Sequence, residues 1–195
     1  EEFTFLTNKP DYISLEGYLF PDTYKITKSE TSEDVVRKML RNFEEQLTDK
    51  LMQKIQDSGR NFHEIITMAS IIEKEVRSLK DKKLVSGILW KRLDSDTRLQ
   101  VDATLVYVRP INYSTVTIDD THIESPYNTY RNEGLPPGPI SNPGMESIIA
   151  ALEPTDSPYW FYLSPSIAYP RFIITSVTFS KFRRKGELAS PTSKF

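Results

Sequence analysis

The periodicity of apolar side chains is clearest in residues 61–78, NFHEIITMASIIEKEVRS. At about 100° per residue, one arc of a helix collects the apolar positions of this segment: Phe62, Ile65, Ile66, Ala69, Ile72 and Val76. Asn61 precedes this run, and Glu64 stands where the second partner of a capping box belongs. The segment is therefore predicted to be a helix with one buried face.

Similar spacing recurs in four other segments: 31–47, 48–57, 80–94, and the stretch that begins at Asn142-Pro143 and ends before Pro154. Strand-like runs follow or interrupt them, at 99–118, 160–165 and 171–179, of which the last two are expected to form a hairpin. The order of helices and then strands, without βαβ alternation, predicts an α+β fold. In it a helical N-terminal half packs on a small, mostly antiparallel sheet.

The composition excludes several kinds of site and partner. The 195 residues suit a single domain, and a net charge of −2 gives no basic excess for binding nucleic acid. The chain has no cysteine and only two histidines, which argues against disulfides, a thiol nucleophile and a zinc site. It has no apolar run long enough to cross a membrane, and it starts at Glu1 without methionine, so we expect it to be part of a longer protein.

One carboxylate interrupts the apolar arc of the 61–78 helix. Glu73 lies four residues after Ala69 and three before Val76, whereas Glu75 is expected to face solvent. Burial disfavours a charged carboxylate and raises its pKa, which suits a general acid that works near neutral pH. A structural role explains the same pattern: Glu73 would pair with a buried arginine, for which Arg92 of the next helix is a candidate, or cap a backbone group.

Other polar residues are candidates for binding a sugar. Gln100 and Asp102 fall on one side of the candidate strand 99–107, and Tyr127, Asn128 and Tyr130 lie in the irregular segment 119–142. Tyrosine rings offer apolar faces to sugar rings, while amides both donate and accept hydrogen bonds. A structural role also explains each of these residues, since tyrosines are common in cores and asparagines in turns.

Six segments, in this order, resemble one known family: LEGYLFPDTY (15–24), ASIIEKEV (69–76), LVSGILWKRL (84–93), LQVDATLVY (99–107), YNTYRNEGLPPGPISNPG (127–144) and ESIIAALEP (146–154). Together they resemble the YceG-like, or MltG-type, endolytic murein transglycosylases of bacteria. The likeness covers about residues 12–163, and it implies that residues 1–195 form one catalytic domain. It also implies that the full-length protein carries an N-terminal membrane anchor and a LysM-like domain, and acts on the extracytoplasmic face of the cytoplasmic membrane.

The resemblance implies a reaction with a single acid and no cofactor. The first glutamate of the family's EKE motif falls on Glu73, which would protonate the glycosidic oxygen within a glycan strand. The same carboxylate would then accept the proton of the muramic acid 6-hydroxyl as a 1,6-anhydro ring closes. The expected substrate is the peptidoglycan glycan strand, and peptidoglycan synthases are expected partners. Glu16, Gln100, Asp102, Tyr127, Asn128, Tyr130, Pro136 and Pro137 are expected to line the cleft.

Residues 133–144, EGLPPGPISNPG, combine four prolines with three glycines. Proline lowers the entropy lost when a loop is ordered, and glycine permits turns and close approach to a ligand. Because the family's motifs continue on both sides, we expect an ordered loop beside Glu73 that forms a wall of the groove.

Two alternatives remain open from the sequence. Asp102 could be a second carboxylate, as hydrolases require, which would make the chain a glycoside hydrolase. The C-terminal stretch YPRFIITSVTFSKFRRKG (169–186) lacks the histidine-bearing segment common in the family, which would fit a glycan-binding or scaffold module that no longer cuts.

Overall fold

The computed structural model describes residues 3–109, 116–163 and 173–175. Its helices are α1 (Ser32–Gln46), α2 (Asp49–Asp57), α3 (Phe62–Glu75), α4 (Leu79–Leu93), α5 (Asp102–Val108) and α6 (Met145–Leu152), with short 3-10 helices η1 (Thr4–Leu6) and η3 (Asp119–His122). The strands are β1 (Phe161–Leu163) and β2 (Ile173–Thr175). The five helices predicted from apolar spacing correspond to α1, α2, α3, α4 and α6.

The predicted α+β fold is wrong, because the described part of the chain is mostly helical. Its strands are three residues each and pair antiparallel, with Phe161 opposite Thr175. This pair is too small to be a layer on which the helices pack. The divergent C-terminal stretch 169–186 lies outside the described residues except for β2.

The candidate strand at 99–107 is also wrong, since most of it is α5. Ala103, Thr104 and Leu105 are buried there, and the helix contacts α3. Strand propensity is a weak preference that burial against a neighbouring element readily overrides. Asp102 in the first turn further favours the helix, because its negative carboxylate interacts favourably with the positive N-terminal end of the helix dipole. Of the predicted strand region 99–118, residues 110–115 lie outside the described part.

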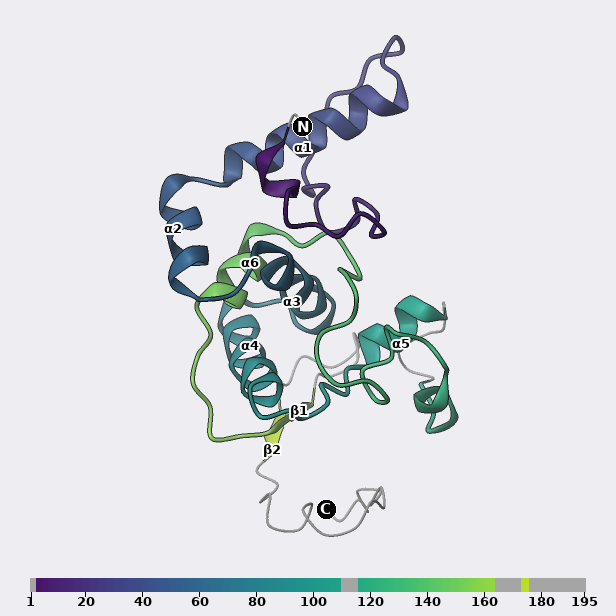
Figure 1. Cartoon of the computed structure of the whole chain (residues 1–195), viewed down its shortest axis with the longest axis vertical. Coiled ribbons are helices and arrows are strands. Elements are labelled where there is room, and N and C mark those ends of the chain that lie inside the picture. Colours follow the sequence, from purple (N-terminus) through teal and green to yellow (C-terminus); the bar gives the residue numbers. More distant parts are fainter. Residues whose placement is uncertain (1–2, 110–115, 164–172, 176–195) are drawn as a thin grey trace.

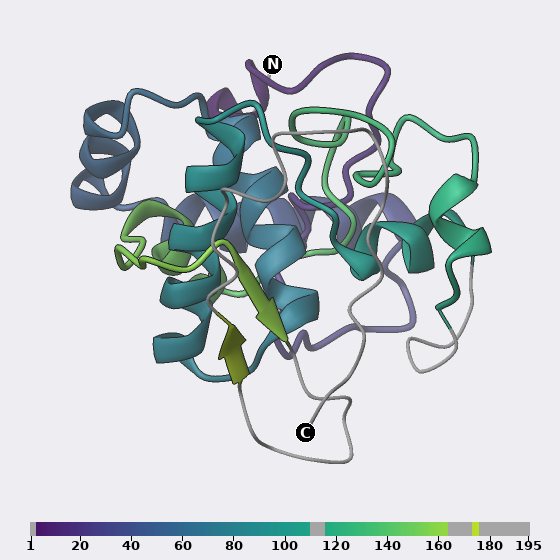
Figure 2. The ribbon, with the colours of Figure 1, turned by 90° about the horizontal axis from the view of Figure 1, so that it is seen from below.

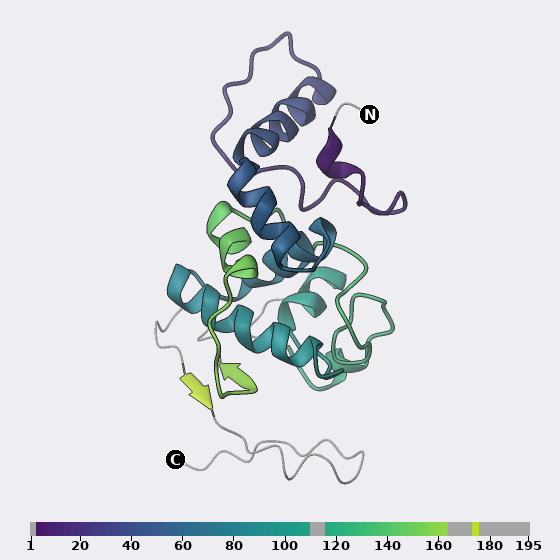
Figure 3. The same cartoon turned by 60° about the vertical axis from the view of Figure 1, so that its left-hand side comes forward.

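Helix α3 is the centre of the core. Nine of its fourteen residues are buried, including every residue from Ile65 to Ile72. A helix that is buried nearly all round needs neighbours on several sides, and α3 contacts α4, α5 and α6. α1 extends away from this group (Figures 1 and 3), while α5 and η3 lie on the side of the molecule opposite α2 (Figures 1 and 2). α3 thus presents different residues to α6 and to α5.

Local interactions set the start of α3. The Asn61 side-chain oxygen accepts from the backbone NH of Glu64 at 2.9 Å, and the Glu64 carboxylate accepts from the backbone NH of Asn61 at 2.9 Å. This is the capping box that the sequence predicts. Helix α6 begins slightly later than predicted, at Met145, because the Asn142 side chain instead accepts from the backbone NH of Gly17 at 2.7 Å.

The Pro/Gly-rich segment is joined to α3 by hydrogen bonds. The backbone NH of Ile140 donates to the Ser70 hydroxyl at 3.0 Å, and the Ser141 hydroxyl donates to the Ser70 carbonyl at 3.0 Å. Gly17 packs against it with a φ of +92°, and a Cβ there would lie 2.3 Å from the Pro139 ring. The segment is therefore part of the packed core, and its last residue, Gly144, reaches the C-terminal end of α3.

Candidate active site

Two glutamates at the C-terminal end of α3 lie in different surroundings. The Oε2 atom of Glu73 accepts from the Ser147 hydroxyl at 2.5 Å, from the Gly144 backbone NH at 3.3 Å and from the Lys82 ammonium at 3.3 Å. Lys82 is buried and lies 3.7 Å from Glu146 as well. Three donors on one oxygen join α3 to α4 and to the first turn of α6, so Glu73 has a structural role in this fold.

Glu75, two residues later, faces the other side of the helix. Its Oε1 atom is buried, although the residue as a whole is only half-buried. The Tyr162 hydroxyl and the backbone NH of Ala103 donate hydrogen bonds to this carboxyl group, and the Asp102 carboxylate is close enough to act on it. The expectation that Glu75 faces solvent is therefore wrong.

The pKa of Glu75 is raised from 4.5 to about 7. Burial is the main cause, because it removes the water that stabilises the charged form, and the negative charge of Asp102 adds to it. The hydrogen bonds from Tyr162 and Ala103 oppose the rise without cancelling it. Glu75 can therefore hold or release a proton near neutral pH, as acid–base catalysis requires.

Two of the predicted site residues gather around Glu75. The Tyr130 hydroxyl donates to Asp102 at 2.5 Å, and burial together with this bond raises the pKa of Tyr130. The Gln100 side chain accepts from Arg92 at 2.6 Å, and its φ of +53° is unusual for a residue other than glycine. Backbone outliers of this kind cluster at functional sites.

Arg92 fixes the chain around this cluster. Its guanidinium donates to the carbonyl oxygens of Arg98, at 3.0 Å from Nε, and Trp160, at 2.9 Å from Nη1. It also lies over the ring of Phe161 at 4.8 Å. The predicted alternative that Arg92 pairs with Glu73 is wrong, since Lys82 takes that place.

Glu16 and Tyr127 form a second cluster at the other end of α5. The Tyr107 hydroxyl donates to Glu16 at 2.8 Å, and the rings of Tyr107 and Tyr127 are 4.9 Å apart. Burial and the Glu16 carboxylate raise the pKa of Tyr107. The sequence analysis did not single out Tyr107. In the strand predicted at 99–107, Tyr107 and Asp102 would lie on opposite faces, whereas both lie on the short helix α5 in the structure.

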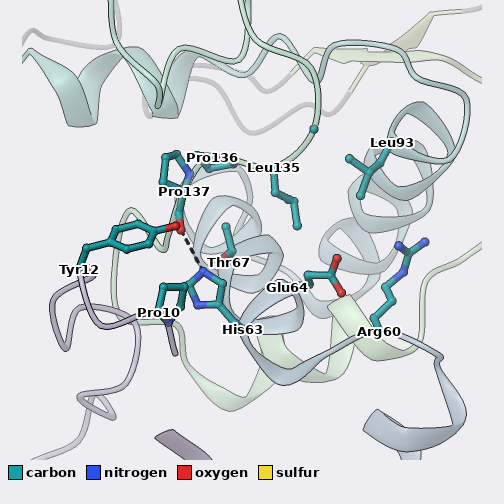
Figure 4. Close-up of a pocket in the computed structure, with 11 residues that line it drawn as sticks. Pro10, Tyr12, Arg60, His63, Glu64, Thr67, Leu93, Leu135, Pro136 and Pro137 are labelled. Carbon is teal, nitrogen blue, oxygen red and sulfur yellow. Dashed lines mark hydrogen bonds between the residues drawn. The ribbon is translucent and has the colours of Figure 1, made fainter. Parts of the chain in front are cut away.

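The other predicted residues lie elsewhere. Asn128 is fully buried, and its amide donates to the carbonyl oxygens of Thr121 and Ile123, so it holds the loop in shape. Pro136 and Pro137 lie beside His63 at the N-terminal end of α3 (Figure 4). The twelve helical positions from there to Glu75 correspond to about 18 Å. The prolines are therefore not next to either glutamate.

The described residues contain no group of three His, Cys, Asp or Glu side chains that could hold a metal ion. Among the helices that the structure describes, none is long and apolar enough to cross a membrane.

Comparisons with known proteins find relatives that match most of the chain. A relative from Bacillus subtilis, named endolytic murein transglycosylase, is 36% identical over 172 residues, which is 88% of this chain and 48% of the relative. A protein of the same name from Streptococcus pneumoniae strain D39 is 34% identical over 155 residues, covering 77% of this chain and 28% of its own length. The chain thus spans less than half the length of either relative.

A solved structure is similar over nearly the whole chain. The crystal structure of a YceG-like protein from Listeria monocytogenes matches with a TM-score of 0.77 and 34% identity, over 90% of this chain and 57% of that one. The sequence profile of the YceG-like family matches residues 3–185. Both the family match and the identity to its members extend over most of the chain, which therefore belongs to the YceG-like family.

Proposed function

We propose that the chain is the catalytic unit of an endolytic murein transglycosylase. It cleaves bonds between N-acetylmuramic acid and N-acetylglucosamine within peptidoglycan strands and leaves 1,6-anhydro ends. The observation that carries the proposal is the desolvated carboxyl group of Glu75, with a pKa of about 7, next to Asp102 and Tyr130. The names of the relatives support the same activity.

The proposed reaction needs one acid and no cofactor. Protonated Glu75 gives its proton to the glycosidic oxygen as the bond to C1 of the muramic acid breaks. The Glu75 carboxylate then accepts the proton of the C6 hydroxyl, whose oxygen forms the new bond to C1. The acid is regenerated, and no water is consumed. In this proposal the glycosidic oxygen replaces the Tyr162 hydroxyl as the partner of Glu75.

The family's motif places the catalytic role on Glu73, and that assignment stays a prediction. The geometry favours Glu75, because the Oε2 atom of Glu73 already has three donors that connect helices. Glu75 also has the titration range of an acid that later acts as a base.

Two matched variants separate the candidates. Glu75→Gln and Glu73→Gln are compared with wild type on purified glycan strands, with the ends identified by mass spectrometry. We expect Glu75→Gln to lose about 10²–10⁴-fold in rate, the usual contribution of a general acid, and Glu73→Gln to lose less. Full activity in a folded Glu75→Gln variant, with none in Glu73→Gln, would assign the reaction to Glu73.

The same products decide between the alternatives. Anhydro ends, which are lighter by one water molecule, support the transglycosylase, whereas ordinary reducing ends indicate a hydrolase in which Asp102 activates water. If the protein binds glycan strands but does not cleave them, the result supports the alternative of a glycan-binding or scaffold module. The same proposal includes the location and the partners. The full-length protein would be anchored to the membrane by another segment, and would act outside the cytoplasm beside peptidoglycan synthases.

A further inference from the structure

A cavity of about 420 Å³ lies at the N-terminal half of α3 (Figure 4). Neither Glu73 nor Glu75 is among the residues that line it. Thr67 and His63 come from α3 itself, while Leu135 to Pro137 of the Pro/Gly-rich segment face them. Tyr12, from the N-terminal segment, stands at the mouth with 79% of its surface exposed. The cavity therefore combines flat ring faces with a floor of helical side chains.

The floor contains a buried hydroxyl group with no partner. Thr67 is 1% exposed, and its Oγ1 atom has no hydrogen bond within the described structure. Burying an unpaired hydroxyl group is unfavourable, and helical threonines usually avoid it by bonding to the preceding turn. Because Oγ1 is itself covered, a hydroxyl or amide group of a ligand in the cavity would pair with it after a small movement of the lining.

The basic groups of the lining, His63 and Arg60, already have partners. His63 donates from Nε2 to the Pro137 carbonyl at 3.0 Å, so its Nδ1 atom accepts from the Tyr18 hydroxyl at 2.7 Å. Arg60 gives one nitrogen to both oxygens of Asp94 at 2.7 and 2.9 Å and stacks on Trp90. The cavity is thus poorly suited to an anion and better suited to a neutral ligand.

We propose that this cavity is a remote sugar-binding subsite. One ring of a glycan strand would lay its apolar face on Tyr12 and the prolines, and a hydroxyl or acetamido group would pair with Thr67. A free carboxylate oxygen of Glu64 is a further acceptor for sugar hydroxyls, because only Oε2 is used in the capping box. The inference rests on the proposed function, because it takes the ligand to be the same glycan strand.

The position of the cavity sets which substrates it serves. Thr67 precedes Glu75 by eight helical positions, or about 12 Å along the axis. A strand that occupies both places has to extend over several rings, whereas a short fragment reaches only one. The subsite therefore favours long strands, as expected of an enzyme that cuts within them.

Conservative pairs of variants test the subsite with chitohexaose, an N-acetylglucosamine oligomer, as the probe in titration calorimetry. Thr67→Val removes the hydroxyl group and keeps the shape, while Thr67→Ser keeps the hydroxyl group. Tyr12→Ala removes the ring, while Tyr12→Phe keeps it. We expect Thr67→Val and Tyr12→Ala each to raise Kd about tenfold, and their partners to bind like wild type. The melting temperature of Thr67→Val is not lowered, because Oγ1 has no partner to lose.

The results separate the subsite from the reaction. Absence of chitohexaose binding in wild type, or unchanged Kd in both Thr67→Val and Tyr12→Ala, overturns the subsite, as does a stem peptide that binds there in place of the sugar. If wild type cleaves glycan strands in that case, the proposed function stands without the subsite. If wild type cleaves nothing but its chitohexaose binding depends on Thr67, the sugar site stands and the reaction is wrong.

Discussion

Replacing Glu75 by glutamine should stabilise the fold at neutral and alkaline pH. The folded state holds the Glu75 proton up to pH of about 7, whereas an unfolded chain releases it near 4.5. Between these values the folded state binds more protons than the unfolded state, so stability falls as pH rises. At 1.36 kcal/mol per pH unit, the loss reaches about 3 kcal/mol above pH 7 and is absent below pH 4.5.

Glutamine carries no charge at any pH, so the variant escapes this loss. We expect the free energy of unfolding of Glu75→Gln, minus that of wild type, to rise by about 3 kcal/mol between pH 4.5 and pH 8. Urea unfolding at several pH values measures it. Glu45→Gln on α1 is the control, since Glu45 is exposed and surface substitutions change stability little.

The reasoning would be refuted if the difference in unfolding free energy between Glu75→Gln and wild type did not change across this pH range. It would mean that the Glu75 carboxyl group is hydrated in the folded protein, and the argument for it as the acid would lose its basis. If the difference in unfolding free energy rises but Glu75→Gln still cleaves glycan strands at the wild-type rate, Glu75 is buried as described but is not the catalytic acid.

Two further predictions concern the surroundings of the two glutamates, and a third concerns the packing of the Pro/Gly-rich segment. Asp102→Asn removes the charge that helps to raise the pKa of Glu75, so the alkaline limb of the pH–rate profile moves to lower pH; an unmoved limb would separate Asp102 from the acid. Ser147→Ala leaves Glu73 without its shortest donor and should cost about 1–3 kcal/mol in urea unfolding, with a smaller effect on cleavage than Glu75→Gln. Gly17→Ala places a Cβ 2.3 Å from a proline ring at a φ of +92°, and should lower stability by more than about 1 kcal/mol; an unchanged melting temperature would contradict this packing.

The sequence was sufficient wherever neighbouring residues decide the outcome. The helix after Asn61 begins at the predicted capping box, whose partners are three residues apart, and the helix predicted at 31–47 is found as α1, which begins at a capping box of the same spacing. The strand prediction for 99–107 was wrong because the β-branched residues of this segment fit a strand as well as a helix. Only contact with α3 decides that Asp102–Val108 is helical.

The sequence by itself determined α1, α2, α3, α4 and α6, the capping of α3 and the family, because these depend on residues close together or on long ordered motifs. It placed two glutamates at one helix end, but wrongly predicted that Glu75 faces solvent. The tertiary structure decided which of the two is desolvated, because the groups that surround each carboxylate come from distant segments. Lys82 and Ser147 bind Glu73, while Asp102 and Tyr162 enclose Glu75. Desolvation is a property of packing, so only the folded structure points to Glu75 as the proposed acid.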